Sequence, residues 1–348
     1  MKAAILYGDG DVRFGEWPEP KIGPGEVKIR VRAAGICGSD IPRVFRGGAH
    51  YYPIVLGHEF SGDIVEVGEG VGGFEVGDKA AGAPLLPCLA CGDCLRGDYA
   101  LCKNYGFIGS RQQGAFAEYV ALPARNAVKI DSSVPYEHAA MLEPSTVALH
   151  GLRLNKYAGG KTVAVLGAGT IGLFTVMWAK DFGAKSVTAF DISGDRLNLA
   201  KELGADGAVN AAEEGFITTA IEQTGGKGYD YVFETAGSVA SMKAAFELAA
   251  NKAGVCFIGT PHEKLEFAPR LWESMNRKEF SLTGSWMSYS APFPGEEWTL
   301  AAHGLMTGRA APPDGMIYKT FPLERCGEAF ALFSGKSGVP GKIMLKGK

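Results

Sequence analysis

The segment from Thr162 to Lys180 carries the pattern that most constrains the fold. It begins with the short apolar run Thr162-Val-Ala-Val-Leu166, which has the length and composition of a buried strand. The glycine-rich turn Gly167-Ala-Gly169-Thr-Ile-Gly172 follows, and an apolar, helix-like stretch then continues to Lys180. A strand, a glycine turn and a helix in this order are typical of a βαβ unit, whose strands lie parallel in one sheet.

The rest of the chain contains two kinds of segment. Strand-like and helix-like segments alternate across residues 152–285, which predicts a doubly wound parallel sheet and an α/β fold. They are Ser186–Phe190, Ser193–Leu203, Tyr229–Glu234, Met242–Ala250 and Gly254–Ile258. Residues 1–151 contain short β-type runs broken by glycine and proline, which predict an irregular β-rich domain. We assign residues 286–348 to this second domain, because its first part has too few helix-like segments to cover a sheet.

The glycine turn and the next predicted strand together indicate a dinucleotide site. Asp191 ends that strand, at the distance from Gly172 that the dinucleotide fingerprint requires. Gly167, Gly169 and Gly172 would let the backbone approach a pyrophosphate at the amino end of the helix. Asp191 would accept hydrogen bonds from the adenosine ribose and repel a 2′-phosphate, so the sequence favours NAD over NADP. Arg196 either contacts the adenosine or points into solvent.

Four of the seven cysteines form a cluster with the spacing C-x2-C-x2-C-x7-C. They are Cys88, Cys91, Cys94 and Cys102. Four thiolates this close can surround one Zn²⁺ tetrahedrally and leave no position for water, so we expect a structural zinc in the lobe 88–102. An iron–sulfur cluster and a redox dithiol are the alternatives, but the spacing favours zinc.

Cys37 and His58 indicate a second metal site. Cys37 follows a predicted strand, and His58 lies in the sequence Gly-His-Glu-Phe-Ser-Gly. A carboxylate would complete the ligand set, and Glu59 and Glu143 are both candidates. Three protein ligands and one water are the arrangement of a catalytic zinc, so we expect two zinc ions per chain. Each residue alone could equally be an ordinary buried or loop residue, so this interpretation depends on their combination with the dinucleotide site.

Together these motifs resemble those of the zinc-containing medium-chain alcohol dehydrogenase family, over essentially the whole chain. The run Gly57–Gly62 is similar to the zinc signature of that family. Glu143 stands in the region where many simple-alcohol enzymes have a cysteine, which resembles the polyol dehydrogenase branch. The resemblance implies a GroES-like catalytic domain (1–151 and 286–348), a Rossmann domain for NAD (152–285), and a homodimer or homotetramer.

The resemblance also implies an oxidoreductase mechanism and further site residues. Zinc would lower the pKa of an alcohol hydroxyl, and Ser39 and Glu143 could accept its proton. Pro42 stands where many members have a histidine of the proton relay, which leaves the outward proton path open. By position, the cofactor contacts implied are Ile171, Asp191, Arg196, Ile258, Gly259, Thr260, Ser285, Trp286 and Met287.

Three stretches resemble members of the branch that oxidise a polyol phosphate, namely 42–53, 108–111 and 284–295. A phosphate group needs cations or hydrogen-bond donors, and the candidates are Arg43, Arg46, His50 and Arg111. Exposed arginines are common without a ligand, so no one of them is decisive. A free polyol of the sorbitol type and L-threonine are the alternative substrates. A non-catalytic NAD-binding or redox-sensing protein is the alternative of another class, and the open zinc set argues against it.

Charge and hydropathy argue against other partners. The formal net charge is −3 and no long basic run is present, so we expect no nucleic acid and no zinc-ribbon nucleic-acid binder. The amino-terminal segment lacks the apolar region of a signal peptide. Glycines interrupt the apolar run 163–179, which a strand and a helix explain better than a membrane span. We therefore expect a cytoplasmic protein that acts on a small molecule.

Overall fold

The computed structural model describes residues 1–334 and 339–347, and it divides the chain into two units. Unit 1 contains Met1–Glu143 and Tyr289–Lys348, and unit 2 contains Pro144–Ser288. The sequence analysis placed these divisions at 151/152 and 285/286. The first differs because helix α4 (Leu142–Leu154) begins in unit 1 and ends in unit 2, so the division falls inside a continuous helix. The stretch predicted as 286–348 includes 335–338 and 348, which lie outside the described residues.

Unit 2 contains the parallel sheet that the sequence predicts. Its strands are β11 (Thr162–Leu166), β12 (Ser186–Asp191), β13 (Gly207–Asn210), β14 (Tyr229–Glu234), β15 (Ala249–Phe257) and β16 (Ser281–Gly284). They lie in the order β13-β12-β11-β14-β15-β16, and every neighbouring pair is parallel. The predicted doubly wound α/β fold is therefore confirmed.

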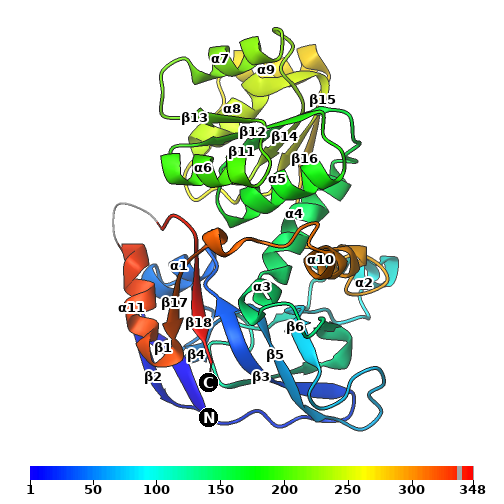
Figure 1. Ribbon diagram of the computed structural model, residues 1–348, viewed down its shortest axis with the longest axis vertical. Coiled ribbons are helices and arrows are strands. Elements are labelled where there is room, and N and C mark those ends of the chain that lie inside the picture. Colours follow the sequence, from blue (N-terminus) through cyan, green and yellow to red (C-terminus); the bar gives the residue numbers. More distant parts are fainter. Residues whose placement is uncertain (335–338, 348) are drawn as a thin grey trace. The chain divides into compact units, whose positions relative to one another are not determined.

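Helices cover both faces of this sheet. They are α5 (Thr170–Asp181), α6 (Gly194–Glu202), α7 (Phe216–Gln223), α8 (Val239–Leu248) and α9 (Pro269–Lys278). Figure 1 shows α5 and α6 on one face and α7, α8 and α9 on the other. The apolar run 163–179 forms β11 and α5, and the side chains from Gly172 to Ala179 are buried. Among the residues described, no helix is long and apolar enough to cross a bilayer.

One boundary inside unit 2 differs from the prediction. The sequence placed a helix over 242–250 and a strand over 254–258, whereas α8 ends at Leu248 and β15 begins at Ala249. Ala249 and Ala250 are small and buried, so the apolar pattern alone fits either element. The pairing of β15 with β14 decides the outcome, and it depends on residues distant in sequence.

Unit 1 is built on a mostly antiparallel sheet. Its strands are β3 (Glu26–Gly35), β5 (Glu59–Val67), β6 (Lys79–Gly82), β9 (Tyr119–Pro123), β10 (Ala127–Lys129), β17 (Ile317–Pro322) and β18 (Lys342–Lys346). They lie in the order β10-β6-β5-β3-β18-β17, and β9 also pairs with β3. Because β18 pairs antiparallel with β3, the carboxy-terminal segment belongs to this sheet.

Smaller elements surround that sheet. Strands β1 (Lys2–Gly8), β2 (Asp11–Glu16) and β4 (Ile54–Val55) form one small sheet, and β7 (Leu85–Leu86) and β8 (Gly106–Phe107) form another. The helices are α1 (Asp40–Phe45), α2 (Gly92–Arg96), α3 (Tyr136–Ala140), α10 (Glu296–Thr307) and α11 (Cys326–Ala331). A buried apolar core joins the larger sheet to β1, β4, α1 and α11, with Ile5, Phe60, Phe116 and Ile343 among its members. The β-rich character predicted for this part of the chain is confirmed.

Candidate active site and cofactor sites

The antiparallel pairing of β3 and β5 brings the residues of the second metal site together. Gly35 at the end of β3 pairs with Glu59 at the start of β5. Cys37 lies just beyond β3, and His58 lies just before β5. One ligand atom from each of Cys37, His58 and Glu59 lies within 4.8 Å of the others. A thiol, an imidazole and a carboxylate in this arrangement are a donor set suited to Zn²⁺.

Gly57 gives the chain the turn that aims His58 into the site. It has a φ of +97°, and a Cβ at this position would lie 2.6 Å from the ring of Phe116. Only glycine fits both demands without displacing the core. The His58 ring then packs edge-on against Phe107, with 5.6 Å between the ring centroids.

Asp40, which the sequence analysis did not select, supports both Cys37 and His58. Its side chain is fully buried, and it accepts a 3.0 Å hydrogen bond from the Cys37 backbone N–H. Its other oxygen lies 3.6 Å from His58 Nδ1 and 3.3 Å from Arg43. Burial opposes ionisation of Asp40, but the charges of His58 and Arg43 lower the pKa of its carboxyl.

The His58 imidazole itself fits a metal ligand. Its Nδ1 is buried and has no hydrogen-bond partner within the described part of the chain. Burial disfavours the charged ring, but the nearby Asp40 and Cys37 raise the pKa of His58 well above its ordinary value. The negative charge that Asp40 and Cys37 place around the ring would equally stabilise a metal cation bound by the neutral imidazole.

A buried lysine pairs with Glu59. Lys342 on β18 donates to both carboxylate oxygens of Glu59, at 2.9 and 2.6 Å, and to the Ile36 carbonyl at 3.3 Å. Both side chains are almost completely buried. Burial opposes the charge of Lys342, but the Glu59 carboxylate raises the pKa of the lysine. The sequence analysis missed Lys342, because it lies 283 positions from Glu59 and no local motif marks it.

Glu143 differs from Glu59, the other candidate carboxylate. It is the second residue of α4, and burial raises its pKa to about 7. The charge of His58 lowers the pKa of Glu143 and the charge of Glu59 raises it further. The Glu143 carboxyl therefore interacts electrostatically with both His58 and Glu59. Among the described residues, the compact group of possible ligands includes Glu59 and Cys37 but not Glu143. The geometry therefore favours Glu59 as the direct ligand.

Ser39 and the predicted phosphate residues lie near this group. The Ser39 hydroxyl donates to Cys37 Sγ at 3.4 Å and accepts a 2.9 Å hydrogen bond from Arg43. Burial and then the charges of Arg111 and Arg43 lower the pKa of His50, so the fields of both arginines reach the imidazole. Arg111 stacks over the ring of Tyr105, 4.6 Å from its centroid. Arg46, by contrast, lies exposed at the end of α1.

The four-cysteine lobe has the geometry of a structural zinc site. The Sγ atoms of Cys88, Cys91, Cys94 and Cys102 all lie within 4.8 Å of one another. The Cys88–Cys94 and Cys91–Cys102 sulfur pairs are 3.9 Å apart, too far for a disulfide. Tetrahedral zinc with bonds of about 2.3 Å requires sulfur separations of about 3.8 Å. Hydrogen bonds from the backbone lower the pKa of Cys91 to about 6, which favours the thiolate that zinc binds.

The glycine turn of unit 2 forms a cradle that a side chain would fill. A Cβ at Gly172 would lie 1.8 Å from the Gly167 carbonyl oxygen. Gly169 precedes the first turn of α5, so the amino end of that helix opens onto the turn. Asp191, at the end of β12, accepts hydrogen bonds from the Ala168 N–H at 2.7 Å and the Ser193 N–H at 2.9 Å. This arrangement fits a dinucleotide pyrophosphate.

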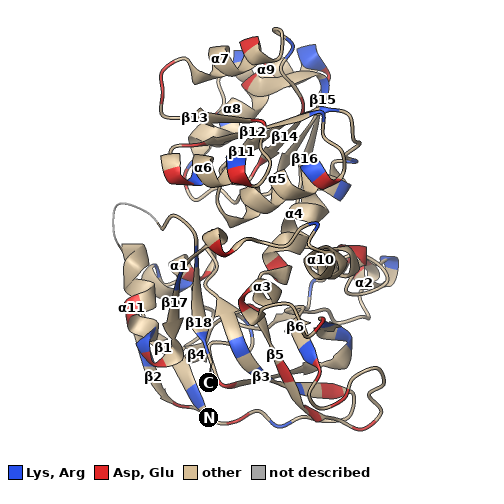
Figure 2. Ribbon diagram, in the orientation of Figure 1, with Lys and Arg blue, Asp and Glu red and all other residues tan. Residues whose placement is uncertain are grey.

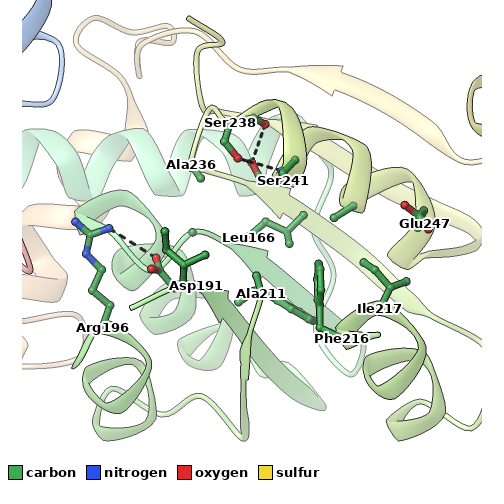
Figure 3. Close-up of a pocket in the computed structure, with 15 residues that line it drawn as sticks. Leu166, Asp191, Arg196, Ala211, Phe216, Ile217, Ala236, Ser238, Ser241 and Glu247 are labelled. Carbon is green, nitrogen blue, oxygen red and sulfur yellow. Dashed lines mark hydrogen bonds and ion pairs between the residues drawn. The ribbon is translucent and has the colours of Figure 1, made fainter. Parts of the chain in front are cut away.

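A pocket of about 310 Å³ adjoins the turn (Figure 3). Asp191 lies at one end, where Arg196 pairs with it at 3.7 Å. Figure 3 shows Phe216 and Ile217 of α7 facing it from one side, and Ala236 and Ser238 from the other. The sequence analysis missed these side chains and Ile192, because each lies after a strand without a motif of its own. An apolar slot with a carboxylate at its edge suits an adenosine group.

The remaining predicted cofactor residues lie at the same edge of the sheet but outside this pocket. Ile258, Gly259 and Thr260 follow β15, and Ser285, Trp286 and Met287 follow β16. A Cβ on Gly237 would lie 2.5 Å from the Thr260 carbonyl, so the turn after β15 packs against the turn after β14. Ile171 lies in the first turn of α5.

Comparisons with known proteins identify the family. Residues 23–132 match the alcohol dehydrogenase GroES-like domain, and residues 170–302 match the zinc-binding dehydrogenase domain. The chain therefore belongs to the zinc-binding, medium-chain alcohol dehydrogenase family, and the resemblance drawn from the motifs is confirmed. The predicted cofactors, zinc and a nicotinamide dinucleotide, agree with this family.

Three relatives are similar over almost their whole length. Galactitol 1-phosphate 5-dehydrogenase of Escherichia coli strain K12 is 40% identical over 346 residues, 99% of this chain and 99% of that protein. The crystal structure of galactitol-1-phosphate dehydrogenase from Escherichia coli has a TM-score of 0.94 at 39% identity and covers 100% of both chains. A zinc-binding dehydrogenase from Sinorhizobium meliloti 1021 bound to NADP has a TM-score of 0.90 at 31% identity and covers 99% of both chains.

The geometry of the two carboxylates predicts different effects on zinc. Glu59→Gln replaces a charged ligand by a neutral amide, so we expect the Kd for zinc to rise at least about tenfold. Glu143→Gln should stay within about threefold of the wild type. The measurement is a competition titration of metal-loaded protein with a chromogenic chelator.

Lys342 requires a control in this experiment, because Glu59→Gln alone leaves its charge buried without a partner. The double variant Glu59→Gln/Lys342→Met removes both charges. Its Kd for zinc should be raised as much as that of Glu59→Gln. Tight zinc binding by the double variant, or weak binding by Glu143→Gln alone, would show that Glu59 is not the ligand.

Proposed function

We propose that this chain is a zinc-dependent, NAD-linked dehydrogenase that oxidises a secondary hydroxyl of galactitol 1-phosphate to give tagatose 6-phosphate. The observation that carries the proposal is the compact group of Cys37, His58 and Glu59. Three protein donors leave the fourth position of a tetrahedral zinc to an exchangeable ligand, the pattern of a catalytic rather than a structural zinc. The 40% identity to a galactitol 1-phosphate 5-dehydrogenase supports the substrate.

The residues of the chain have separate tasks in this reaction. When bound, zinc supplies Lewis acidity toward the substrate hydroxyl, and NAD supplies the hydride acceptor. Cys37, His58 and Glu59 would hold the metal. Asp40 lies 3.6 Å from His58 Nδ1 and would help to orient the imidazole toward the metal. Glu143, with a pKa of about 7, can accept the hydroxyl proton on a carboxylate oxygen near neutral pH.

Asp191 supports NAD rather than NADP as the cofactor. Its carboxylate accepts two backbone hydrogen bonds, which hold it at the end of β12 beside the pocket. A fixed negative charge at this position would repel a 2′-phosphate and accept hydrogen bonds from a free ribose. Arg196 forms an ion pair with Asp191, so the positive charge that could attract a 2′-phosphate is balanced by the carboxylate.

The cations around His50 support a phosphorylated substrate. His50 and Arg111 are exposed, and Arg43 lies near them and hydrogen bonds to Ser39 beside Cys37. Like charges repel one another, so a cluster of this kind is more stable with a bound anion. A phosphate that accepts hydrogen bonds from Arg111 and His50 would fix one end of the polyol within reach of the metal ligands.

Substitution of Arg111 tests this phosphate contact. Arg111→Ala should lower kcat/KM for galactitol 1-phosphate by about 10–100-fold, because it removes a hydrogen bond between charged groups. The value for free galactitol should change by less than about threefold. Arg46→Ala is the matched control, since Arg46 is an exposed arginine at the end of α1 and its loss should leave both values unchanged.

NAD reduction at 340 nm measures both rates, and the panel includes sorbitol and L-threonine. Equal kcat/KM values of the wild type for the phosphorylated and the free polyol would remove the phosphate assignment. A higher value for L-threonine or sorbitol would replace the substrate and keep the dehydrogenase chemistry.

We also propose that the chain forms a homodimer through β16. Within the described part of the sheet, β16 pairs with β15 alone and so forms one edge. Leu282 on this strand is 38% exposed, and Trp286 just beyond it is 53% exposed. An apolar edge strand can pair with the same strand of a second copy about a twofold axis.

A charge on this edge should separate the copies. Leu282→Lys would place two lysines near the twofold axis, so light scattering should find the variant at the chain mass of 36.8 kDa and the wild type at about twice that mass. Leu300→Lys, at an exposed leucine on α10, should remain dimeric. A wild type with the mass of a single chain would contradict the proposal.

A further inference from the structure

Glu234 is a buried carboxylate at the point where the order of the strands reverses. It ends β14, which lies next to β11 in the sheet. From β11 the chain continues to β12 on one side, whereas β14 and β15 continue on the other. Open α/β sheets bind ligands at the carboxyl ends of the strands beside such a reversal. The Glu234 side chain is 0% exposed, and burial of a carboxylate is costly unless hydrogen bonds or a paired charge compensate it.

One carboxylate oxygen of Glu234 fixes the turn after β14. Its Oε1 accepts hydrogen bonds from the Ala236 N–H at 2.9 Å, the Gly237 N–H at 2.8 Å and the Ser241 hydroxyl at 2.7 Å. Two of these donors are consecutive backbone groups of the turn, and the third lies in the first turns of α8. Three hydrogen bonds to one oxygen atom therefore fix the conformation of the turn that follows β14.

The same residue contacts the turn after β15. The Glu234 backbone carbonyl accepts hydrogen bonds from the Ile258 N–H at 2.8 Å and the Gly259 N–H at 3.0 Å. Its side-chain Oε2 packs against Gly259, where an added Cβ would lie 2.6 Å away. That oxygen has no hydrogen-bond partner among the residues that the structure describes.

Thr235, the next residue, extends this connection to the glycine turn after β11. Its hydroxyl lies 3.0 Å from the Leu166 carbonyl and 2.8 Å from the Gly167 carbonyl, as a donor to either. Two consecutive residues thus connect the three turns that leave β11, β14 and β15. No sequence motif marked Glu234, since its neighbours in space come from three separate segments.

These contacts reach the dinucleotide pocket. Gly167, Ala236, Ser238 and Ser241 line it, and Figure 3 shows Ser238 and Ser241 hydrogen bonded to each other at its wall. Glu234 does not line the pocket, so its influence passes through the residues that it holds. We propose that Glu234 is a positioning residue that preforms the wall of the dinucleotide pocket, an inference that rests on the proposed binding of NAD.

The chemistry of Oε2 indicates what the position requires. Burial raises the pKa of Glu234, and hydrogen bonds from Ser241 and the backbone only partly oppose this shift. A neutral side chain of the same length, with one oxygen able to accept the three hydrogen bonds, should therefore suffice. Glutamine meets this requirement, whereas alanine does not.

Direct titration of the zinc-loaded protein with NADH, followed by fluorescence, tests the proposal. Glu234→Ala should raise the Kd for NADH at least about tenfold, and Glu234→Gln should remain within about threefold of the wild type. In turnover, the KM for NAD should rise in Glu234→Ala while kcat changes much less. Zinc content should be the same in all these variants.

Glu297→Ala is the matched control. Glu297 is also a buried carboxylate, 1% exposed, and it accepts a hydrogen bond from Ser290 in unit 1. Its loss should lower the melting temperature and leave the Kd for NADH unchanged. If Glu234→Ala does not fold, Glu234→Asp carries the test, because its shorter side chain withdraws the acceptor and should also raise the Kd.

Three outcomes distinguish the possibilities. Unchanged NADH binding by Glu234→Ala or Glu234→Asp, with normal binding by the wild type, would overturn this inference alone. An equal loss of affinity in Glu297→Ala would also overturn it, since the effect would then be general destabilisation. A wild type that binds no NADH would overturn the proposed function, and this inference with it.

Discussion

The buried charges around Cys37 are the constraint on which the rest of unit 1 depends. Asp40, His58, Glu59 and Lys342 are all almost or completely withdrawn from water. A charge buried without a partner costs several kcal/mol, so no one of these groups is tolerable without the others. Lys342 balances Glu59, and Asp40 faces His58. The ion pair also ties the carboxy-terminal strand β18 to Glu59, the proposed metal ligand at the start of β5, so the fold of unit 1 and its donor set depend on each other.

The proposed cofactor site in unit 2 depends on the space that its glycines leave, whereas the proposed metal site in unit 1 depends on buried charges. Its glycine turn has room for a phosphate because side chains are absent, and its pocket has apolar walls with Asp191 at one edge. The turns that build this site come from separate strands, and buried hydrogen bonds of Glu234 and Thr235 hold them together. Figure 2 shows acidic and basic residues spread over the helices of this unit, whereas the sheet beneath them is largely uncharged. We therefore expect the specificity of the proposed dinucleotide site to come from a few fixed polar atoms in apolar surroundings.

Local motifs explain how much could be predicted from the sequence. The glycine turn with Asp191 predicted the parallel sheet, and the cysteine spacing predicted the lobe, because each signal lies within one short segment. Asp40 had a local signal that was overlooked, since a carboxylate three residues after Cys37 can accept its backbone N–H. Lys342 had none, because it reaches Glu59 only after β18 joins the sheet of β3 and β5. The choice between Glu59 and Glu143 depends on where each side chain lies, which a sequence pattern does not specify.

The same reasoning explains the elements that the sequence did not reveal. β13 is short and half-buried, and α7 supplies Phe216 and Ile217 to a pocket wall that no motif marks. Sheet pairing, not apolar periodicity, decides where α8 ends and β15 begins. Residues whose role depends on contacts with segments distant in sequence are thus the ones that local sequence patterns do not predict.

Zinc content tests the central claim most directly, namely that Cys37, His58 and a carboxylate hold a metal distinct from that of the cysteine lobe. Elemental analysis of fully loaded protein should find two zinc ions per chain in the wild type and one in Cys37→Ser, as the two separate donor groups require. One zinc per chain in the wild type, or two in Cys37→Ser, would contradict the account.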